Sequence, residues 1–579
     1  MPPTVTIVTP TRHSRLPFFR LLARCVQEQD YKHIKEWVVV GGDSDNSALK
    51  ADIGNVFKVT KGLPPLVWVD GASNTNIGAL RNASNDAATC DIIVPMDDDD
   101  YYPPTRVSHV VSMFQQHSDK LVAGCTRHYM YDYETDTFVQ WRGFGPNHGT
   151  NNTIAYKREY ALKNRYDDSK KMAEEPTFLK NFTEPMVQLN PDKTVVQLAH
   201  SGNTFSKRRH MLSYIMNGDE KNPLKFTPKA KKVFPKGVLK RYCEICPMGD
   251  VYDIVYYLGT GQPPWHPTDT QLGGSEQAVL HLSELWASQG LSVGVFGDWE
   301  TKFVHNDVVY ESWTRFNIRA PHKNVILWRL CGCLVLKFKL GAKNVVIDLH
   351  DINWESSFGK LLPQVHCIAT KSEFHKKAIA QVAHKKGVAI PNGLRDVFLK
   401  QTANPPARQR FRFVYASSYK RGLEMILQQL FPGIRSFIPE AELHVFYGMH
   451  DIDDEAQKAN LTKLLDQPGV FEYGRLDVDE VIKQKQMSDF HLYISGTLAE
   501  TDCITIRESA ALGCIPITAN VNVFAERPGL RVNMPLHIDA LCTTIKNDET
   551  IDSLREGCMA DDSLFNWETV AKKWNAILI

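Results

Sequence analysis

The chain has 579 residues, too many for a single hydrophobic core, and 43% of them are apolar, as in a globular protein. Its 67 basic and 66 acidic residues leave a formal net charge of +1, so no overall field recruits nucleic acid or an anionic membrane. The N-terminus has no basic-then-apolar leader pattern, and no apolar run approaches the roughly 20 residues that cross a bilayer. We therefore expect a cytoplasmic protein of two to four domains without a nucleic-acid partner.

The first part of the chain alternates predicted strands and helices. They come in the order strand 5–10, helix 18–29, strand 36–42, strand 65–70, helix 77–90 and strand 91–96. This alternation predicts an α/β domain with a mostly parallel sheet, whose ligand lies at the carboxyl edge of the strands.

The stretch "IIVPMDDDDYYPP" places four consecutive aspartates at that edge, directly after an apolar run. Such a cluster carries a repulsive cost and typically meets a cation. The alternative is a solvated acidic turn closed by Pro103 and Pro104. The fragment alone does not decide between them.

The segment 216–247 is basic and punctuated by prolines, without clear periodicity, and we interpret it as a linker. A docking arm is the alternative to a linker for this segment. The segment contains Cys243 and Cys246, which resemble half of a zinc site but have no obvious second half. Among the 12 scattered cysteines, reduced structural thiols are favoured.

Two further α/β units follow, separated near "NPPARQR". The predicted elements are strand 251–258, helix 273–290 and strands 291–298, 344–351, 364–370, 387–393, 411–418, 441–448, 489–496 and 514–520. The predicted boundaries are 1–215, 216–247, 248–404 and 405–579.

The motifs "TIVTPTRHSR", "NTNIGALRNASND" and "VPMDDDDYYPP", in this order, resemble glycosyltransferase family 2, inverting enzymes of the GT-A fold, over roughly residues 4 to 210. The resemblance implies a nucleotide-sugar donor, UDP- or GDP-linked, and contacts to it from Thr9, Pro10, Arg12, Asp43, Asn76, Arg81, Asp97 and Asp98. It also implies a divalent cation, Mn²⁺ or Mg²⁺, with Asp99 as the direct ligand and Asp97, Asp100 and His200 as further candidates. A core histidine is the alternative for His200.

An inverting transfer needs a base that deprotonates the acceptor hydroxyl. The acidic pair in "KMAEEPTF" matches the family's position for it, with Glu175 as the base and Glu174 as its neighbour. The alternative is that both are helix N-terminal acids favoured by the helix dipole. Trp141 could be a sugar platform or core, and for Trp37 we favour the core.

In the C-terminal half, "LAETDCITIRESAALGCIPI" places Glu500 on a loop and Glu508 inside the following helix, whose N-terminus suits a diphosphate. With "GGSEQAVLHL" and "YASSYKRGLEMIL", it resembles the E-x7-E motif of glycosyltransferase family 4, retaining enzymes of the GT-B fold, over roughly residues 250 to 579. The resemblance implies that Glu508 binds ribose and that Glu500 and His350 act at the sugar and in the acceptor cleft. It implies donor contacts from Gly273, Gly274, Ser417, Lys420, Arg421 and Glu508, without a metal.

The chain departs from that family in two places. It has Ser417 and Ser418 where an arginine is typical, and Thr501 where a glycine follows the first glutamate. A phosphate site with one cation fewer can still use backbone donors at helix N-termini.

We therefore predict an α/β protein with a GT-A domain followed by a GT-B domain of two Rossmann-like lobes. The predicted function is a bifunctional hexosyl- or pentosyltransferase that extends one glycan in sequence, with an inverting, metal-dependent site and a retaining, metal-independent site. The alternative is one active GT-A domain with a catalytically silent carbohydrate-binding or scaffolding module. A nucleotidyltransferase would need a glycine-rich loop with a basic residue after the first strand, unlike "VTPTRHSR".

Overall fold

The computed structural model describes the whole chain apart from residues 72–75, 134–136, 201–202, 204–206, 208–210, 212–223, 228–229, 247–248, 261–264, 271, 353–361, 380–385, 401–404, 495–499 and 534. The chain divides into two compact units. Unit 1 comprises Met1–Gly249 with Asn317–Arg319, and unit 2 comprises Asp250–Phe316 with Ala320–Ile579.

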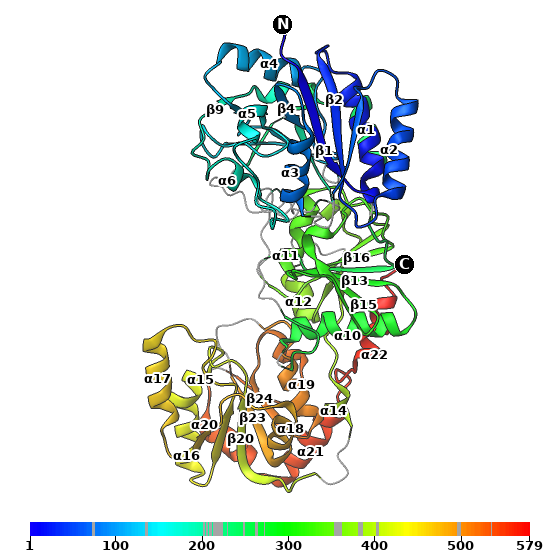
Figure 1. Ribbon diagram of the computed structural model, residues 1–579. Coiled ribbons are helices and arrows are strands. Elements are labelled where there is room, and N and C mark those ends of the chain that lie inside the picture. Colours follow the sequence, from blue (N-terminus) through cyan, green and yellow to red (C-terminus); the bar gives the residue numbers. More distant parts are fainter. Residues whose placement is uncertain are drawn as a thin grey trace. The chain divides into compact units, whose positions relative to one another are not determined.

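Unit 1 is built on a seven-stranded sheet in the order β3-β2-β1-β4-β8-β5-β9 (Figure 1). Its strands are β1 Val5–Thr11, β2 Ile34–Gly41, β3 Leu66–Asp70, β4 Ile92–Pro95, β5 Val122–Gly124, β8 Ala155–Lys157 and β9 Met186–Gln188. The first four are parallel and β8 is antiparallel to its neighbours. Because β1 and β4 are adjacent, the loops that follow them meet at the same edge of the sheet.

A second, four-stranded sheet of unit 1 has the order β10-β6-β7-β11. It contains β6 Tyr129–Asp132, β7 Thr137–Trp141, β10 Val196–Ala199 and β11 Leu224–Phe226. The helices of the unit are α1 Leu16–Gln27, α2 Ser47–Val59, α3 Ile77–Ala87, α4 Arg106–Gln116, α5 Arg158–Ala161, α6 Glu175–Phe178, α8 Ala230–Val233 and α9 Lys236–Ile245.

Helix α1 shows why these segments form as they do. Phe19, Leu22 and Val26 recur at helical spacing and lie in the main core of the unit. Trp37 is fully buried there and stacks on Phe19, with ring centroids 5.0 Å apart. The core assignment of Trp37 is confirmed.

The predicted linker differs from what the structure shows. Its second half forms α9, which belongs to unit 1 and packs against α1. Val238, Leu239 and Tyr242 provide an apolar stripe at helical spacing, and Tyr242 is fully buried. The chain therefore passes into unit 2 after Gly249, beyond a helix that is part of the first core.

Unit 2 begins with a lobe whose eight strands have the order β14-β15-β13-β12-β16-β17-β18-β19. These are β12 Ile254–Tyr257, β13 Val293–Gly297, β14 Phe303–His305, β15 Val308–Ser312, β16 Asn324–Trp328, β17 Asn344–Asp348, β18 Cys367–Thr370 and β19 Gly387–Ala389. All pairs except β14 with β15 are parallel. The main helices are α10 Gly274–Ser288, α11 Arg329–Cys333, α12 Glu373–Ala378 and α14 Asp396–Leu399.

The second lobe has a parallel six-stranded sheet in the order β22-β21-β20-β23-β24-β25. Its strands are β20 Gln409–Ala416, β21 Glu442–Phe446, β22 Val470–Glu472, β23 Ser488–Tyr493, β24 Ile515–Ala519 and β25 Leu530–Val532. Its helices are α15 Leu423–Met425, α16 Phe431–Phe437, α17 Glu455–Leu465, α18 Val478–Met487, α19 Ile504–Ala511, α20 Ile538–Ile545 and α21 Asp548–Met559.

The last helix, α22 Trp567–Asn575, returns to the first lobe of unit 2 and packs against α10 (Figure 1). Trp574 is buried in that lobe's core, and the Trp286 indole donates a hydrogen bond to Asn575 at 3.0 Å. The two Rossmann-like lobes are thus tied by a returning helix as well as by the chain that connects them. The predicted fold class is confirmed.

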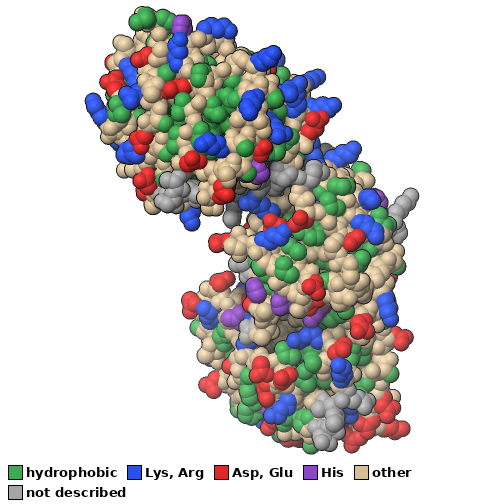
Figure 2. Space-filling view, turned by 45° about the vertical axis from the view of Figure 1, so that its right-hand side comes forward, with side chains coloured by type: hydrophobic (Ala, Val, Ile, Leu, Met, Phe, Trp, Pro, Cys, Tyr) green, Lys and Arg blue, Asp and Glu red, His purple; other side chains and the backbone are tan. Residues whose placement is uncertain are grey.

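Acidic and basic side chains are interspersed over the face that Figure 2 shows, in keeping with the net charge of +1. Within the described residues, no helix is both long enough and apolar enough to span a bilayer. All 12 cysteines are free of disulfide bonds, and ten of them are buried.

Candidate functional site

The first candidate site is a cavity of about 770 Å³ in unit 1, at the carboxyl edge of its main sheet. It brings together residues that lie up to 197 positions apart in the chain, from Pro10 to Lys207. The predicted site residues that line it are Pro10, Arg12, Asn76, Arg81, Asp97, Asp98, Asp99, Glu174 and Glu175.

Three of the four aspartates are buried, Asp97 is partly buried, and basic side chains lie opposite them, so the solvated-turn interpretation is wrong. Asp98, Asp99 and Asp100 are each at most 5% exposed. Arg15 Nη1 donates to Asp98 Oδ1 at 3.1 Å and to Asp99 Oδ2 at 2.6 Å.

The remaining two aspartates have other basic partners. Arg81 Nη1 donates to Asp97 at 3.0 Å, and Lys207 Nζ lies 3.7 Å from Asp100. Three cations therefore face four aspartates in this part of unit 1.

Burial affects the aspartates unequally. Burial and the neighbouring charge of Asp99 raise the pKa of Asp98 and of Asp100 to about 7. Burial also acts against the charged form of Asp99, but Arg15 and Lys207 outweigh it and hold the pKa of Asp99 well below its usual range. Asp99 is therefore the aspartate of the three that stays ionised at neutral pH.

The residues fit a divalent cation. Asp97 and Asp99 both offer carboxylate oxygens to the cavity. No group of three or more His, Cys, Asp or Glu side chains suited to a metal occurs among the residues that the structure describes. A cation there would take its other ligands from diphosphate oxygens and water, as Mg²⁺ commonly does.

The glutamate pair closes another side of the cavity and has two different environments. Glu174 Oε1 accepts hydrogen bonds from Arg81 Nε and Asn151 Nδ2, each at 2.6 Å. Glu175 Oε1 accepts the backbone N–H of Asn151 at 3.1 Å, and Glu175 forms no ion pair with a described residue. Burial, followed by the charge of Glu174, raises the pKa of Glu175 to about 7.

This environment favours Glu175 as the base, since an effective general base has a pKa near the working pH. Glu174 is committed to Arg81 and Asn151 and holds that side of the cavity in place. The residue before the pair, Ala173, has a φ of +52°, a left-handed conformation that a side chain disfavours. The backbone therefore turns sharply just before Glu174 and Glu175.

We expect kcat/KM of the first transfer to fall about tenfold per pH unit below pH 7. Glu175 acts as a base only when deprotonated, and with a pKa of about 7 its deprotonated fraction falls as the pH decreases. Initial rates between pH 5 and 9 measure this. A rate that stays level down to pH 5 would contradict the assignment.

Four predicted residues lie outside the cavity lining. Thr9 is fully buried, and its hydroxyl donates to the Met96 carbonyl, because β1 continues to Thr11. Asp43 accepts the backbone N–H of His13 at 2.7 Å. Asp100 and His200 lie behind the lining, where the neighbours of Asp100 are Asn152 and the backbone N–H of Leu198. The structure does not bring Thr9 or Asp43 to the cavity.

His200 is next to the aspartates although it does not line the cavity. Its ring stacks on Phe18 at 4.7 Å, and Nε2 lies 3.5 Å from Asp99 Oδ2. Burial lowers its pKa, so the neutral imidazole predominates. Both the core interpretation and a role beside Asp99 are compatible with this position.

Sequence reasoning missed Arg15, Asn151 and Lys207. Arg15 was inside a quoted motif but had no assigned partner, and it meets Asp98 and Asp99 from more than 80 residues away. Asn151 and Lys207 lie in no recognisable pattern.

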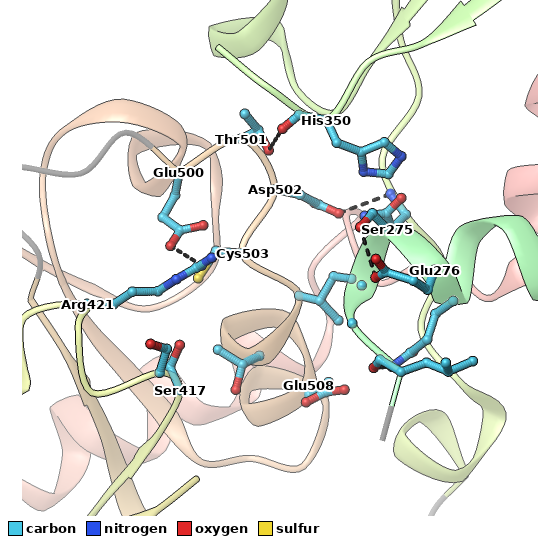
Figure 3. Close-up of a pocket in the computed structure, with 18 of the residues that line it drawn as sticks. Ser275, Glu276, His350, Ser417, Arg421, Glu500, Thr501, Asp502, Cys503 and Glu508 are labelled. Carbon is cyan, nitrogen blue, oxygen red and sulfur yellow. Dashed lines mark hydrogen bonds and ion pairs between the residues drawn. The ribbon is translucent and has the colours of Figure 1, made fainter. Parts of the chain in front are cut away.

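The second candidate site is a cavity of about 1220 Å³ in unit 2, lined from both lobes (Figure 3). The predicted residues that line it are Gly273, Gly274, His350, Ser417, Arg421, Glu500 and Glu508. Lys420 is exposed and does not line it. As predicted, Glu500 lies on the loop before α19 and Glu508 lies within that helix.

Two helix N-termini meet at this cavity, that of α10 from one lobe and that of α19 from the other. A Cβ on Gly274 would lie 2.5 Å from Ile504 Cδ1, which shows how closely the two helices approach each other here. Cys503, before α19, has a φ of +55°, a left-handed conformation that turns the chain into the helix. The unpaired N–H groups of both helices make this a suitable place for a diphosphate.

Several of the cavity's charged side chains are paired with one another. Glu500 accepts hydrogen bonds from Arg421 and, at 2.8 Å, from the Tyr493 hydroxyl, and Figure 3 shows Arg421 reaching toward Glu500. Glu508 Oε2 lies 2.9 Å from Nζ of the buried Lys485, which sequence reasoning missed. A ligand here competes with existing ion pairs.

His350 is held by a buried group beneath the cavity. Its Nε2 is 3.0 Å from Asp348 Oδ2, and Asp348 also contacts Lys371 and the Tyr256 hydroxyl. Burial lowers the pKa of His350 despite the charge of Asp348. Asp348 therefore accepts the Nε2 proton of a neutral imidazole, which leaves Nδ1 as an acceptor.

The family comparison matches the first site. Residues 6–178 match the family model of glycosyl transferase family 2, which confirms the resemblance for this part of the chain. The matched segment contains the aspartates and both glutamates of the cavity. The protein is therefore a glycosyltransferase, and its N-terminal part carries a family 2 domain.

Solved structures of glycosyltransferases are also similar. Sucrose-phosphate synthase from Thermosynechococcus elongatus is 16% identical, with 56% of this chain and 97% of that chain covered and a TM-score of 0.44. Anabaena HepE in complex with UDP and glucose is 12% identical, with 56% and 98% covered and a TM-score of 0.43.

The catalytic domain of starch synthase IV from Arabidopsis thaliana, bound to ADP and acarbose, is 11% identical, with 57% and 99% covered and a TM-score of 0.42. No curated protein sequence matches the chain.

Proposed function

We propose that the protein carries two glycosyl transfer sites, an inverting one in unit 1 and a retaining one in unit 2, both using nucleotide sugars. The observation that carries the first is the position of Glu175 in one cavity with Asp97 and Asp99. A base and a carboxylate cluster are the two groups that an inverting transfer with a diphosphate leaving group needs.

In the first site, the acceptor hydroxyl oxygen attacks the anomeric carbon as the bond from that carbon to the diphosphate breaks, and Glu175 takes the hydroxyl proton. Arg81 and Asn151 hold Glu174 in place beside it. Arg12, Arg15 and Lys207 line the cavity and supply positive charge to the departing nucleotide. A divalent cation, when bound at Asp97 and Asp99, would neutralise charge on the diphosphate.

In the second site, the N-termini of α10 and α19 support diphosphate binding, with Arg421 as the nearby cation. Glu508 then accepts hydrogen bonds from the ribose, Glu500 from the sugar, and His350 Nδ1 from a sugar hydroxyl. Retention of configuration rests on the family 4 resemblance of the E-x7-E motif, and no metal is required by these groups.

We expect Glu508→Gln to raise the donor KM of the second transfer at least tenfold, because a hydrogen bond to a charged group contributes about 1.5–3 kcal/mol. Donor KM values for both transfers measure this. Glu424→Gln is the matched control, since Glu424 bonds Gln428 and Asn460 and does not line the cavity. A normal KM in Glu508→Gln would remove Glu508 from the donor site.

The alternative function for unit 2 is a silent carbohydrate-binding or scaffolding module. One observation favours it: Arg421, Lys485 and Arg329 are each already paired with a carboxylate in the cavity. Donor hydrolysis and transfer by the full chain, compared with the Glu508→Gln variant, distinguish the two. A silent module predicts the same product spectrum from both proteins.

Covalent linkage of two transferases is useful when they share a glycan, so we propose that one site's product is the other's acceptor. Tethering can raise the local concentration of the intermediate to the millimolar range. The test compares the intact chain with an equimolar mixture of two variants, the Glu175→Gln chain, in which the first transfer is lost, and the Glu508→Gln chain, with the second donor held below the raised KM of that variant. If neither site accepts the other's product, the two activities serve different glycans.

A further inference from the structure

The turn formed by residues 97–100, here called the aspartate turn, is held at both ends by tyrosine hydroxyls. The backbone N–H of Asp97 donates to Tyr102 Oη at 2.7 Å. At the other end, the Tyr242 hydroxyl donates to the carbonyl oxygen of Asp100 at 2.9 Å. The turn that carries the carboxylates is therefore fixed through its backbone.

Tyr242 comes from a distant part of the chain. It lies on α9, 64 residues beyond the end of the segment 6–178 that matches family 2. Its side chain is fully buried, with the Phe234 ring at 5.7 Å and Cys25 Sγ 4.0 Å from the hydroxyl. It is thus built into the core rather than resting against the surface.

The rest of α9 explains this burial. Val238, Leu239 and Cys243 also pack against the main core of unit 1, and α9 contacts α1. Lys240 and Arg241 lie on its outer face. A segment that reads as a basic linker is therefore an amphipathic helix that inserts one hydroxyl behind the candidate catalytic turn.

The position of this hydroxyl has a direct consequence for Asp97 and Asp99. A buried carbonyl needs a hydrogen-bond partner, and the Asp100 carbonyl has Tyr242. Without the hydroxyl, the turn can shift to find another donor. Displacement of reacting groups by about 1 Å costs about 100-fold in rate in other enzymes.

We propose that Tyr242 is a positioning residue for the first transfer site, and that α9 is a working part of the family 2 domain rather than a connector. Tyr242 acts through the aspartate turn and does not line the cavity. This inference rests on the proposed function of that cavity.

The test is Tyr242→Phe in the full chain, which removes one oxygen and keeps the ring. We expect amide hydrogen exchange of residues 97–101 to quicken about tenfold, and kcat of the first transfer to fall about tenfold with the donor KM changed less than twofold. The matched control is Tyr31→Phe, since Tyr31 also donates its hydroxyl to a backbone carbonyl of unit 1, that of Pro3, at 2.6 Å.

Unchanged exchange in residues 97–101, or faster exchange with unchanged kcat, overturns the positioning role. A fall in kcat that is fully explained by a lowered Tm also overturns it, because such a fall shows that the Tyr242 contact only stabilises the fold. If the wild-type chain transfers no sugar, the proposed function fails. The exchange measurement still tests whether Tyr242 holds the aspartate turn in place.

Discussion

Glu175→Gln should lower kcat of the first transfer by about 100- to 10,000-fold, the range that general bases contribute. The substitution keeps the size of the side chain and its hydrogen bond from the Asn151 backbone, so donor binding should stay normal. Steady-state rates with saturating acceptor, together with a direct titration of the donor nucleotide, measure the two effects separately.

Glu174→Gln is the informative comparison for this variant. Its hydrogen bonds from Arg81 and Asn151 favour a supporting role over proton transfer. We expect a smaller loss, accompanied by weaker donor binding. If Glu174→Gln were inactive and Glu175→Gln active, the base would be one residue earlier than assigned.

Asp99→Asn should abolish cation binding by the first site and reduce its transfer at least 100-fold. Asp99 stays ionised because of Arg15, and it is the carboxylate that the family resemblance assigns to the metal. Asparagine has the same shape and can still bond Asn203, which contacts Asp99 at 3.0 Å. Mn²⁺ binding, followed by electron paramagnetic resonance, gives a readout independent of activity.

The control for this variant is Asp192→Asn. Asp192 accepts the Tyr129 hydroxyl in the same unit and does not line the cavity. It should bind Mn²⁺ and transfer sugar like the wild type. Full transfer by the wild type in excess chelator would contradict the metal assignment altogether.

The fold could be predicted because its elements have strong local patterns. Apolar runs such as those of β1, β2 and β12 are strands in the structure, and the apolar periodicity after Gly273 is α10. The helix α9 was missed because its basic residues masked the spacing of Val238 and Tyr242. Basic residues dominate the local sequence pattern of this segment. The contact between α9 and the core of unit 1 is tertiary, so that pattern does not show it.

The carboxylates of the candidate sites could be predicted from the sequence, but the basic side chains that pair with them could not. The aspartates and glutamates lie in short motifs, and Asp97, Asp98, Asp99 and both glutamates of the first site meet in one cavity. Arg15 with Asp99, and Lys485 with Glu508, are pairs that only the fold brings together. Thr9 was predicted to contact the donor nucleotide, but it lies within β1, which continues to Thr11.

The central claim, two active sites of opposite stereochemistry on one chain, is tested most directly by the anomeric configuration of the products. The measurement is proton NMR of the glycans made from each accepted donor by the wild type, Glu175→Gln and Glu508→Gln chains. We predict one linkage inverted relative to its donor, lost only in Glu175→Gln, and one retained, weakened only in Glu508→Gln. A single linkage in the wild type, or both linkages lost together in one variant, would contradict it.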